Sequence, residues 1–159
     1  MGFALSTLQL KSPAFQHRGA IPPKHSYDGG NISPPLQWRD IPDGTRSLAV
    51  FCHDPDAPLV SATGNYGFVH WLVYNIPPEV SGLPQGEKGY AKGSNDFKEF
   101  GYGGPRPPRG HGPHYYYFWL MALDLEPVIQ DGLSLADFLE KVEPHVLGMN
   151  RLIGCFETL

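Results

Sequence analysis

The segment FVHWLVYNI, residues 68–76, is rich in β-branched and aromatic residues and is followed by Pro77 and Pro78. Such a run, closed by prolines, predicts a β-strand. Strict alternation places His70, Leu72, Tyr74 and Ile76 on one face and Val69, Trp71, Val73 and Asn75 on the other. Both faces are largely apolar, so we expect a central strand covered on both sides, with its histidine near one rim of the sheet.

Four further segments of similar character predict the rest of a β-rich fold. They are Leu5–Lys11, Ser47–His53, Tyr115–Leu123 and Leu152–Glu157. The chain has 19 glycines and 17 prolines among 159 residues, and this density breaks helices and favours strands joined by ordered loops. The length suits one domain, which we expect to span residues 1–159.

One segment near the C-terminus has a helical pattern. Ser134 is a suitable cap, and apolar residues then recur at helical spacing, at Leu135, Phe138, Leu139 and Val142. Pro144 should end or kink this helix, and a short second turn is expected over residues 145–149. The whole pattern therefore predicts an antiparallel β-sandwich with one or two late helices.

Composition and charge exclude several classes of function. The formal net charge of −4 gives no basic footprint for nucleic acid, and no apolar run approaches the ~18 residues of a membrane-spanning helix. Cys52 and Cys155 both lie in apolar runs, which favours two buried thiols in a reducing compartment and leaves a bridge between them open. The N-terminus does not resemble a signal peptide, so we expect a cytoplasmic protein, and nothing in the sequence predicts a cofactor.

Two carboxylates follow the strand at residues 47–53. In the segment HDPDAP, residues 53–58, Asp54 and Asp56 are separated by a proline that restricts the backbone around them. An ionised carboxylate near a core needs a partner, so these residues are candidates for a binding site. A plain solvated turn is the alternative, because Asp and Pro are both common turn residues.

A long Gly/Pro loop, residues 103–113, precedes a strand that begins His114-Tyr115-Tyr116. Alternation directs His114 and Tyr116 to the same face, where they can point into one pocket. The alternative is an aromatic core with a decorated loop. His111 and His114 have a spacing that would suit a metal on a helix, but this segment is predicted to be a loop, so we expect no metal site.

Taken in order, these segments resemble the signatures of the phosphatidylethanolamine-binding family, which includes Raf kinase inhibitor-like proteins. The stretches 28–38 and 93–104 are also similar to its prokaryotic branch. The resemblance implies a Greek-key β-sandwich with a helix near a pocket for phosphoryl head-groups and other small anions. Carried over by position, the residues of that pocket are Asp54, Asp56, His70, Pro107, Pro108, His114 and Tyr116. It further implies a homodimer and a kinase or protease partner. The sequence departs from the family pattern at Tyr115, where relatives often have Arg or Lys, and at Arg106, where many bacterial relatives have Cys.

Two functions follow from these residues. In the first, the protein is a binding module: Asp54 orients an imidazole, and a protonated His70 or His114 faces a small anionic or phosphorylated ligand. In the second, Asp54, His70 and His114 carry out acid–base catalysis in a hydrolase or isomerase. The sequence contains no Gly-x-Ser-x-Gly motif, and both cysteines are predicted to be buried. No covalent nucleophile is therefore predicted, which favours the binding module over an enzyme.

Overall fold

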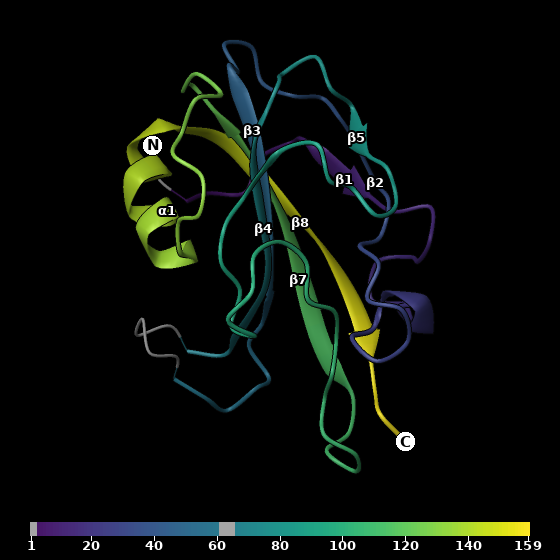
Figure 1. The fold of residues 1–159 in the computed structure, drawn as a ribbon. Coiled ribbons are helices and arrows are strands. Elements are labelled where there is room, and N and C mark those ends of the chain that lie inside the picture. Colours follow the sequence, from purple (N-terminus) through teal and green to yellow (C-terminus); the bar gives the residue numbers. More distant parts are fainter. Residues whose placement is uncertain (1–2, 61–65) are drawn as a thin grey trace.

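Two antiparallel sheets form the body of the computed structural model, which describes residues 3–60 and 66–159 (Figure 1). The larger sheet has the strand order β6-β4-β3-β7-β8, and the smaller has the order β1-β2-β5. The large sheet consists of β6 (Ala91–Lys92), β4 (Phe68–Ile76), β3 (Ser47–Asp54), β7 (His114–Leu123) and β8 (Val146–Phe156). The small sheet consists of β1 (Gln9–Lys11), β2 (Leu36–Arg39) and β5 (Gly82–Leu83). The predicted antiparallel β-sandwich is confirmed.

The large sheet buries both of its faces. One face packs on the small sheet, with Trp71 and Phe118 beside Trp38 and Leu83 in a single core. The other packs on the helix α1 (Leu135–Val142), where Phe138 lies against Tyr74 in a second core. Because of this double cover, β3, β4 and β7 are apolar on both sides, as predicted for residues 68–76.

Strict alternation along β4 is wrong at two places, because the strand contains two irregularities. Cys52 pairs with Trp71 and His53 with Val69, so His70 is an extra residue in the ladder. A second extra residue lies near Asn75, whose φ is 60°. A β-bulge of this kind redirects side chains. It turns His70 to the face of the sheet that carries Tyr116, and the two ring centroids are 5.1 Å apart.

The helix α1 is capped as predicted, since the Ser134 hydroxyl accepts a hydrogen bond from the Asp137 N–H at 3.1 Å. The turn expected over residues 145–149 is wrong. A 3₁₀ turn, Glu143–His145, follows the helix, and Val146 already belongs to β8. The reason is tertiary, because β8 pairs with β7 from Val146 to Phe156 and satisfies backbone groups that a short helical turn would leave open.

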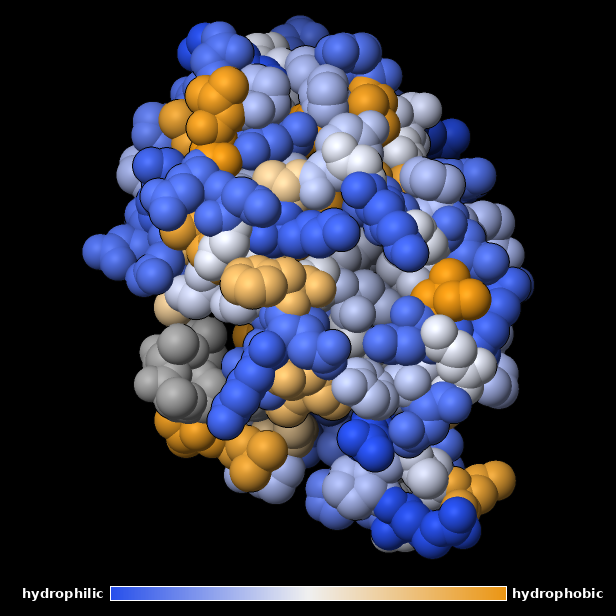
Figure 2. Space-filling model, in the orientation of Figure 1, coloured by the Kyte–Doolittle hydropathy of each residue, from blue (hydrophilic) through white to orange (hydrophobic). Residues whose placement is uncertain are grey.

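The remaining sequence predictions are confirmed in part. Of Leu5–Lys11, only residues 9–11 form a strand, and β2, β5 and β6 were not predicted. Cys52 is buried, but Cys155 is only half-buried, and both thiols are free. No helix in the described part of the chain is long and apolar enough to cross a membrane. Figure 2 shows hydrophobic residues in small groups separated by hydrophilic ones.

Replacing Phe138 by Ala should lower the free energy of unfolding by about 3–5 kcal/mol, because the ring is fully buried between the helix and the large sheet. Urea denaturation followed by tryptophan fluorescence measures this loss. The matched control is Phe100→Ala, since the Phe100 side chain is 65% exposed, and we expect a change within about 0.5 kcal/mol. Equal losses in the two variants would contradict the role of α1 as a cover for the sheet.

Candidate functional site

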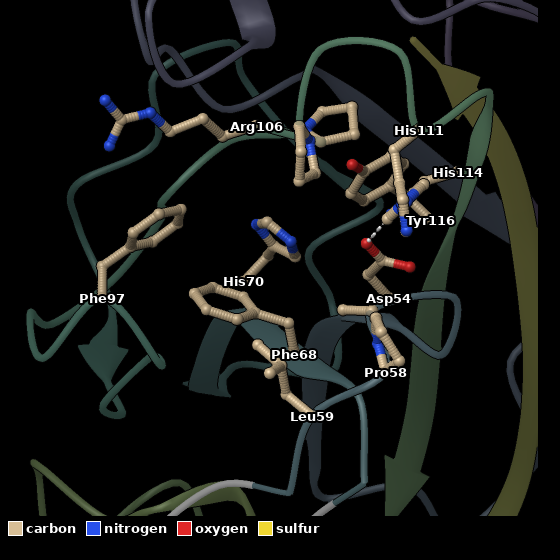
Figure 3. Close-up of a pocket in the computed structure, with 13 residues that line it drawn as sticks. Asp54, Pro58, Leu59, Phe68, His70, Phe97, Arg106, His111, His114 and Tyr116 are labelled. Carbon is tan, nitrogen blue, oxygen red and sulfur yellow. Dashed lines mark hydrogen bonds and ion pairs between the residues drawn. The ribbon is translucent and has the colours of Figure 1, made fainter. Parts of the chain in front are cut away.

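A cavity of about 320 Å³ lies where β3 ends and where β4 and β7 begin, beneath the Gly/Pro loop that leads into β7 (Figure 3). Three strand ends meet there because β3 is central and pairs antiparallel with both β4 and β7. The described residues that line it are Asp54, Ala57, Pro58, Leu59, Phe68, His70, Phe97, Arg106, Pro107, Pro108, His111, His114 and Tyr116. Six of the seven residues predicted for the site are therefore brought together.

Three side chains form a hydrogen-bonded chain on one side of the cavity. The Asp54 carboxylate oxygen Oδ2 lies 2.7 Å from His114 Nδ1, and both side chains are buried. His114 Nε2 in turn lies 2.7 Å from Nδ1 of the more exposed His111. The other carboxylate oxygen of Asp54 accepts the Asp56 N–H at 2.8 Å. Both oxygens of the buried carboxylate therefore have hydrogen-bond partners, as buried polar groups require.

The protons in this chain follow from the partners. A carboxylate can only accept, so His114 Nδ1 carries a hydrogen and donates it to Asp54. In the neutral chain, His111 Nδ1–H then donates to His114 Nε2, which leaves His111 Nε2 as an acceptor. One added proton converts that outer nitrogen into a donor and gives the histidine pair a positive charge.

His70 is almost fully buried, and this burial lowers its pKa to about 4. Its Nδ1 lies 2.7 Å from the Gly103 carbonyl oxygen, which can only accept, so Nδ1 carries the hydrogen. The Gly103 N–H returns a hydrogen bond of 2.8 Å to the His70 carbonyl. His70 is therefore neutral near pH 7, and its Nε2 is an acceptor. Of the two alternatives, burial thus favours His114 over His70 as the protonated histidine of the predicted anion site, since desolvation outweighs the carbonyl contacts of His70.

Close backbone contacts hold the Gly/Pro loop over the cavity. The Gly104 N–H donates to Asn31 Oδ1 at 2.7 Å, and the Tyr27 N–H donates to the Pro105 carbonyl at 2.9 Å. A Cβ atom at Gly104 would lie 2.1 Å from the His25 carbonyl oxygen, so only glycine fits here. These contacts bring Pro107 and Pro108 to the cavity, as predicted from the family resemblance.

Tyr116 supplies an unpartnered polar group to the cavity wall. Its hydroxyl is buried and has no hydrogen-bond partner among the described residues. Burial, followed by the charge of Asp54, raises the pKa of this phenol well above its usual range. The hydroxyl therefore keeps its hydrogen, and a ligand atom or water is needed to accept it.

Asp56 and Tyr115 both lie outside the cavity. The Asp56 side chain is exposed, and its Oδ2 accepts the Tyr115 N–H at 2.8 Å. This bond joins the loop after β3 to the beginning of β7, so Asp56 positions the loop that follows Asp54. Tyr115 points away from the cavity, as alternation along β7 predicts.

Arg106 lines the rim, but other groups hold its guanidinium. Its Nε lies 3.1 Å from Asp28 Oδ2, and the guanidinium carbon is 5.0 Å from the centre of the Tyr27 ring. In Figure 3 the side chain extends away from Asp54 and His114. Its positive charge is therefore balanced outside the cavity.

Sequence reasoning did not assign Phe68, Phe97 and His111 to the site. His111 was considered only as a metal ligand, although its spacing to His114 was visible. Phe97 lies far along the chain, and the bonds of its neighbours bring it here. Asn95 Oδ1 accepts the Phe97 N–H at 3.0 Å, Asp96 Oδ2 accepts the Val69 N–H at 2.7 Å, and the Asp96 N–H donates to the Val69 carbonyl at 2.9 Å. In the described part of the chain, no group of three or more His, Cys, Asp or Glu residues is arranged to hold a metal ion.

Comparison with known proteins gives one consistent result. A family model described as "Phosphatidylethanolamine-binding protein" matches residues 11–157. A UPF0098 protein of Methanothermobacter thermautotrophicus is 43% identical over 156 residues, which cover 94% of this chain and 98% of that protein. A phosphatidylethanolamine-binding protein homologue from Chlamydia trachomatis has a TM-score of 0.86 at 37% identity and covers 96% of this chain and 98% of its own. The YbcL protein of E. coli has a TM-score of 0.87 at 31% identity, with coverage of 97% and 100%.

The free energy of unfolding should decrease as the pH falls from about 6.5 towards 4, because His70 stays neutral in the folded protein down to about 4. The unfolded chain binds a proton near 6.5, so it holds more protons in this window, and each pH unit costs about 1.4 kcal/mol. NMR titration of the imidazole signals measures His70 directly, and urea denaturation of wild type and His70→Gln isolates its share. A His70 signal that titrates near pH 6.5 would contradict the buried, neutral ring.

Proposed function

This chain belongs to the phosphatidylethanolamine-binding protein family, and on that premise we propose that its cavity binds a small anion, such as phosphate or a phosphoryl head-group. The observation that carries the proposal is the hydrogen-bonded chain Asp54–His114–His111 beside the unpartnered hydroxyl of Tyr116. An anion oxygen placed there accepts from Tyr116 and from the protonated histidine pair. Charge-assisted hydrogen bonds of this kind are stronger than neutral ones.

A carboxylate in an anion site requires an explanation, since like charges repel. Asp54 turns one oxygen to the Asp56 N–H and the other to His114, so neither oxygen is left for the ligand. Its charge is opposed by the proton on the histidine pair and acts through His114 rather than on the anion. His70 Nε2 adds an acceptor, which suits a phosphate oxygen that still carries a hydrogen.

A second candidate function is acid–base catalysis by the same three residues. A buried carboxylate that orients one histidine, with a second histidine at the exposed end, is an arrangement able to move a proton at His111 Nε2. The described lining residues include no serine, threonine, cysteine or lysine, so the reaction proposed for this site is proton transfer or activation of water by the histidines and Asp54. Turnover of a panel of small phosphate and carboxylate esters that is lost in His114→Ala would support it.

The family resemblance supports three further proposals: a kinase or protease partner, a regulatory or inhibitory role, and a homodimer. The proposed cytoplasmic location rests instead on the two free thiols, which fit a reducing compartment. A pull-down that is competed by phosphate would connect a protein partner to the cavity.

Phosphate, phosphorylethanolamine and acetate should bind to wild type and lose at least about tenfold in affinity in His114→Ala, because the variant removes the group that links Asp54 to the anion. Calorimetry measures the dissociation constants. The matched control is His145→Ala, since His145 forms a similar pair with Asp124 at 2.8 Å outside the cavity. Binding that is equal in all three proteins would overturn the proposed site.

Sulfate should bind less tightly to His111→Gln than to wild type at a constant pH, because an amide cannot carry the positive charge that the His111–His114 pair can carry. Calorimetry measures both dissociation constants, and equal affinities would contradict the role of His111 as the outer donor.

A further inference from the structure

Apart from Arg106 at the rim, the charged and hydroxyl-bearing side chains lie on one side of the cavity. Asp54, His111, His114 and Tyr116 gather on that side, and Figure 3 shows Phe68, Phe97 and Leu59 on the other, with His70 between the two groups. The neutral His70 ring contacts both sides, since its centroid lies 5.1 Å from that of Tyr116 and 4.8 Å from that of Phe68. The cavity thus has a polar end and an aromatic end.

The aromatic end is a built surface rather than a gap in packing. Phe68 and Phe97 meet edge to face with centroids 4.7 Å apart, and Phe97 stacks on Tyr27 at 4.3 Å. Both phenylalanine rings remain only partly buried, and Leu59 is 56% exposed. Exposing large apolar side chains to water beside a polar site is unfavourable unless a ligand covers them.

The volume of the cavity also suits a ligand that is larger than a bare anion. About 320 Å³ lies at the lower end of the range that binds small organic ligands. A bare phosphate on the polar groups would leave the surface of Phe68 and Phe97 in water. An organic group joined to the anion would remove that surface from water and gain the contacts of the rings.

Charge limits the ligand to one anionic end. His70 is neutral, and the guanidinium of Arg106 is held by Asp28 and Tyr27. The aromatic end therefore offers no free cation among the described residues that line it. Two rings at an angle of 66° present both an edge and a face, which is the geometry that an added aromatic ring prefers.

Resting on the anion-binding function proposed above, we infer that the ligand is an aryl anion: a single phosphate or carboxylate bound by Tyr116 and the histidine pair, carried by an aromatic ring that packs on Phe68 and Phe97. The inference deepens the proposed site by naming the second half of its ligand. It also assigns Phe97, which enters the site from the loop after β6, as the residue that selects the organic group.

The test compares phenyl phosphate, cyclohexyl phosphate and methyl phosphate, which present the same phosphoryl group, by calorimetry at pH 6.5 on the full chain. We expect phenyl phosphate to bind about tenfold or more tightly than methyl phosphate, with cyclohexyl phosphate weaker than phenyl phosphate. Phe97→Leu keeps an apolar side chain and should reduce the preference, measured as the ratio of the phenyl phosphate and methyl phosphate dissociation constants in the same variant. Phe100→Ala is the control, because this exposed ring lies outside the cavity and should leave the preference intact.

The outcomes separate the two proposals. If methyl phosphate binds and phenyl phosphate binds no better, or if cyclohexyl phosphate binds as tightly as phenyl phosphate, the aryl inference is overturned and the anion site stands. If none of the three binds at any pH from 5.5 to 7.5, the anion site itself is overturned. Phe97→Leu is checked by its thermal unfolding curve, and a folded variant that keeps the full preference for phenyl phosphate also overturns the inference.

Discussion

The buried charge of Asp54 is the constraint on which the site depends. A carboxylate that is 3% exposed carries a desolvation cost that several hydrogen bonds must offset. The Asp56 N–H and His114 Nδ1 supply those bonds, and each needs a particular local structure. The first requires the tight turn Asp54-Pro55-Asp56 directly after β3, and the second requires β7 to begin at His114, in register with β3. The pairing of the two strands and the composition of the turn are therefore tied to one side chain.

The same carboxylate explains why the two histidines of the strands behave differently. His114 faces Asp54, whereas His70 faces the carbonyl of Gly103 and lies in an almost fully buried position. A carbonyl is a weak compensation for a buried imidazolium, so the pKa of His70 falls to about 4. One imidazole is coupled to a negative charge and the other is fixed as a neutral acceptor. A site with donors on one side and an acceptor in the middle results from two histidines with different partners.

How much the sequence predicts depends on whether a residue's position is set by local pattern or by distant contacts. Around His114 and Tyr116, β7 pairs with β8 without a break, so alternation placed both residues on one face correctly. On β4 the same rule failed at His70, because the bulge is stabilised by Asp96, which lies 27 positions from Val69 in sequence. Phe97 was missed for the same reason, since Asn95 and Asp96 place it. The resemblance identified six residues that line the cavity. The seventh, Asp56, lies outside the cavity, where its carboxylate accepts a hydrogen bond from the Tyr115 N–H.

The polar and aromatic ends of the cavity differ in the same respect, because local strand pattern places one and distant contacts place the other. The polar end is built by β3 and β7, whose register is fixed by an unbroken ladder, and its three hydrogen-bonded groups leave little freedom for substitution. The aromatic end is built by Phe68 at the first position of β4 and by Phe97 on a loop, where a change of side chain costs little backbone pairing. In the proposed site, the anionic group of the ligand contacts side chains held by strand pairing and by buried hydrogen bonds. Its organic group contacts side chains outside that network, and specificity within such a family would accordingly reside at positions 68 and 97 rather than in the signature residues.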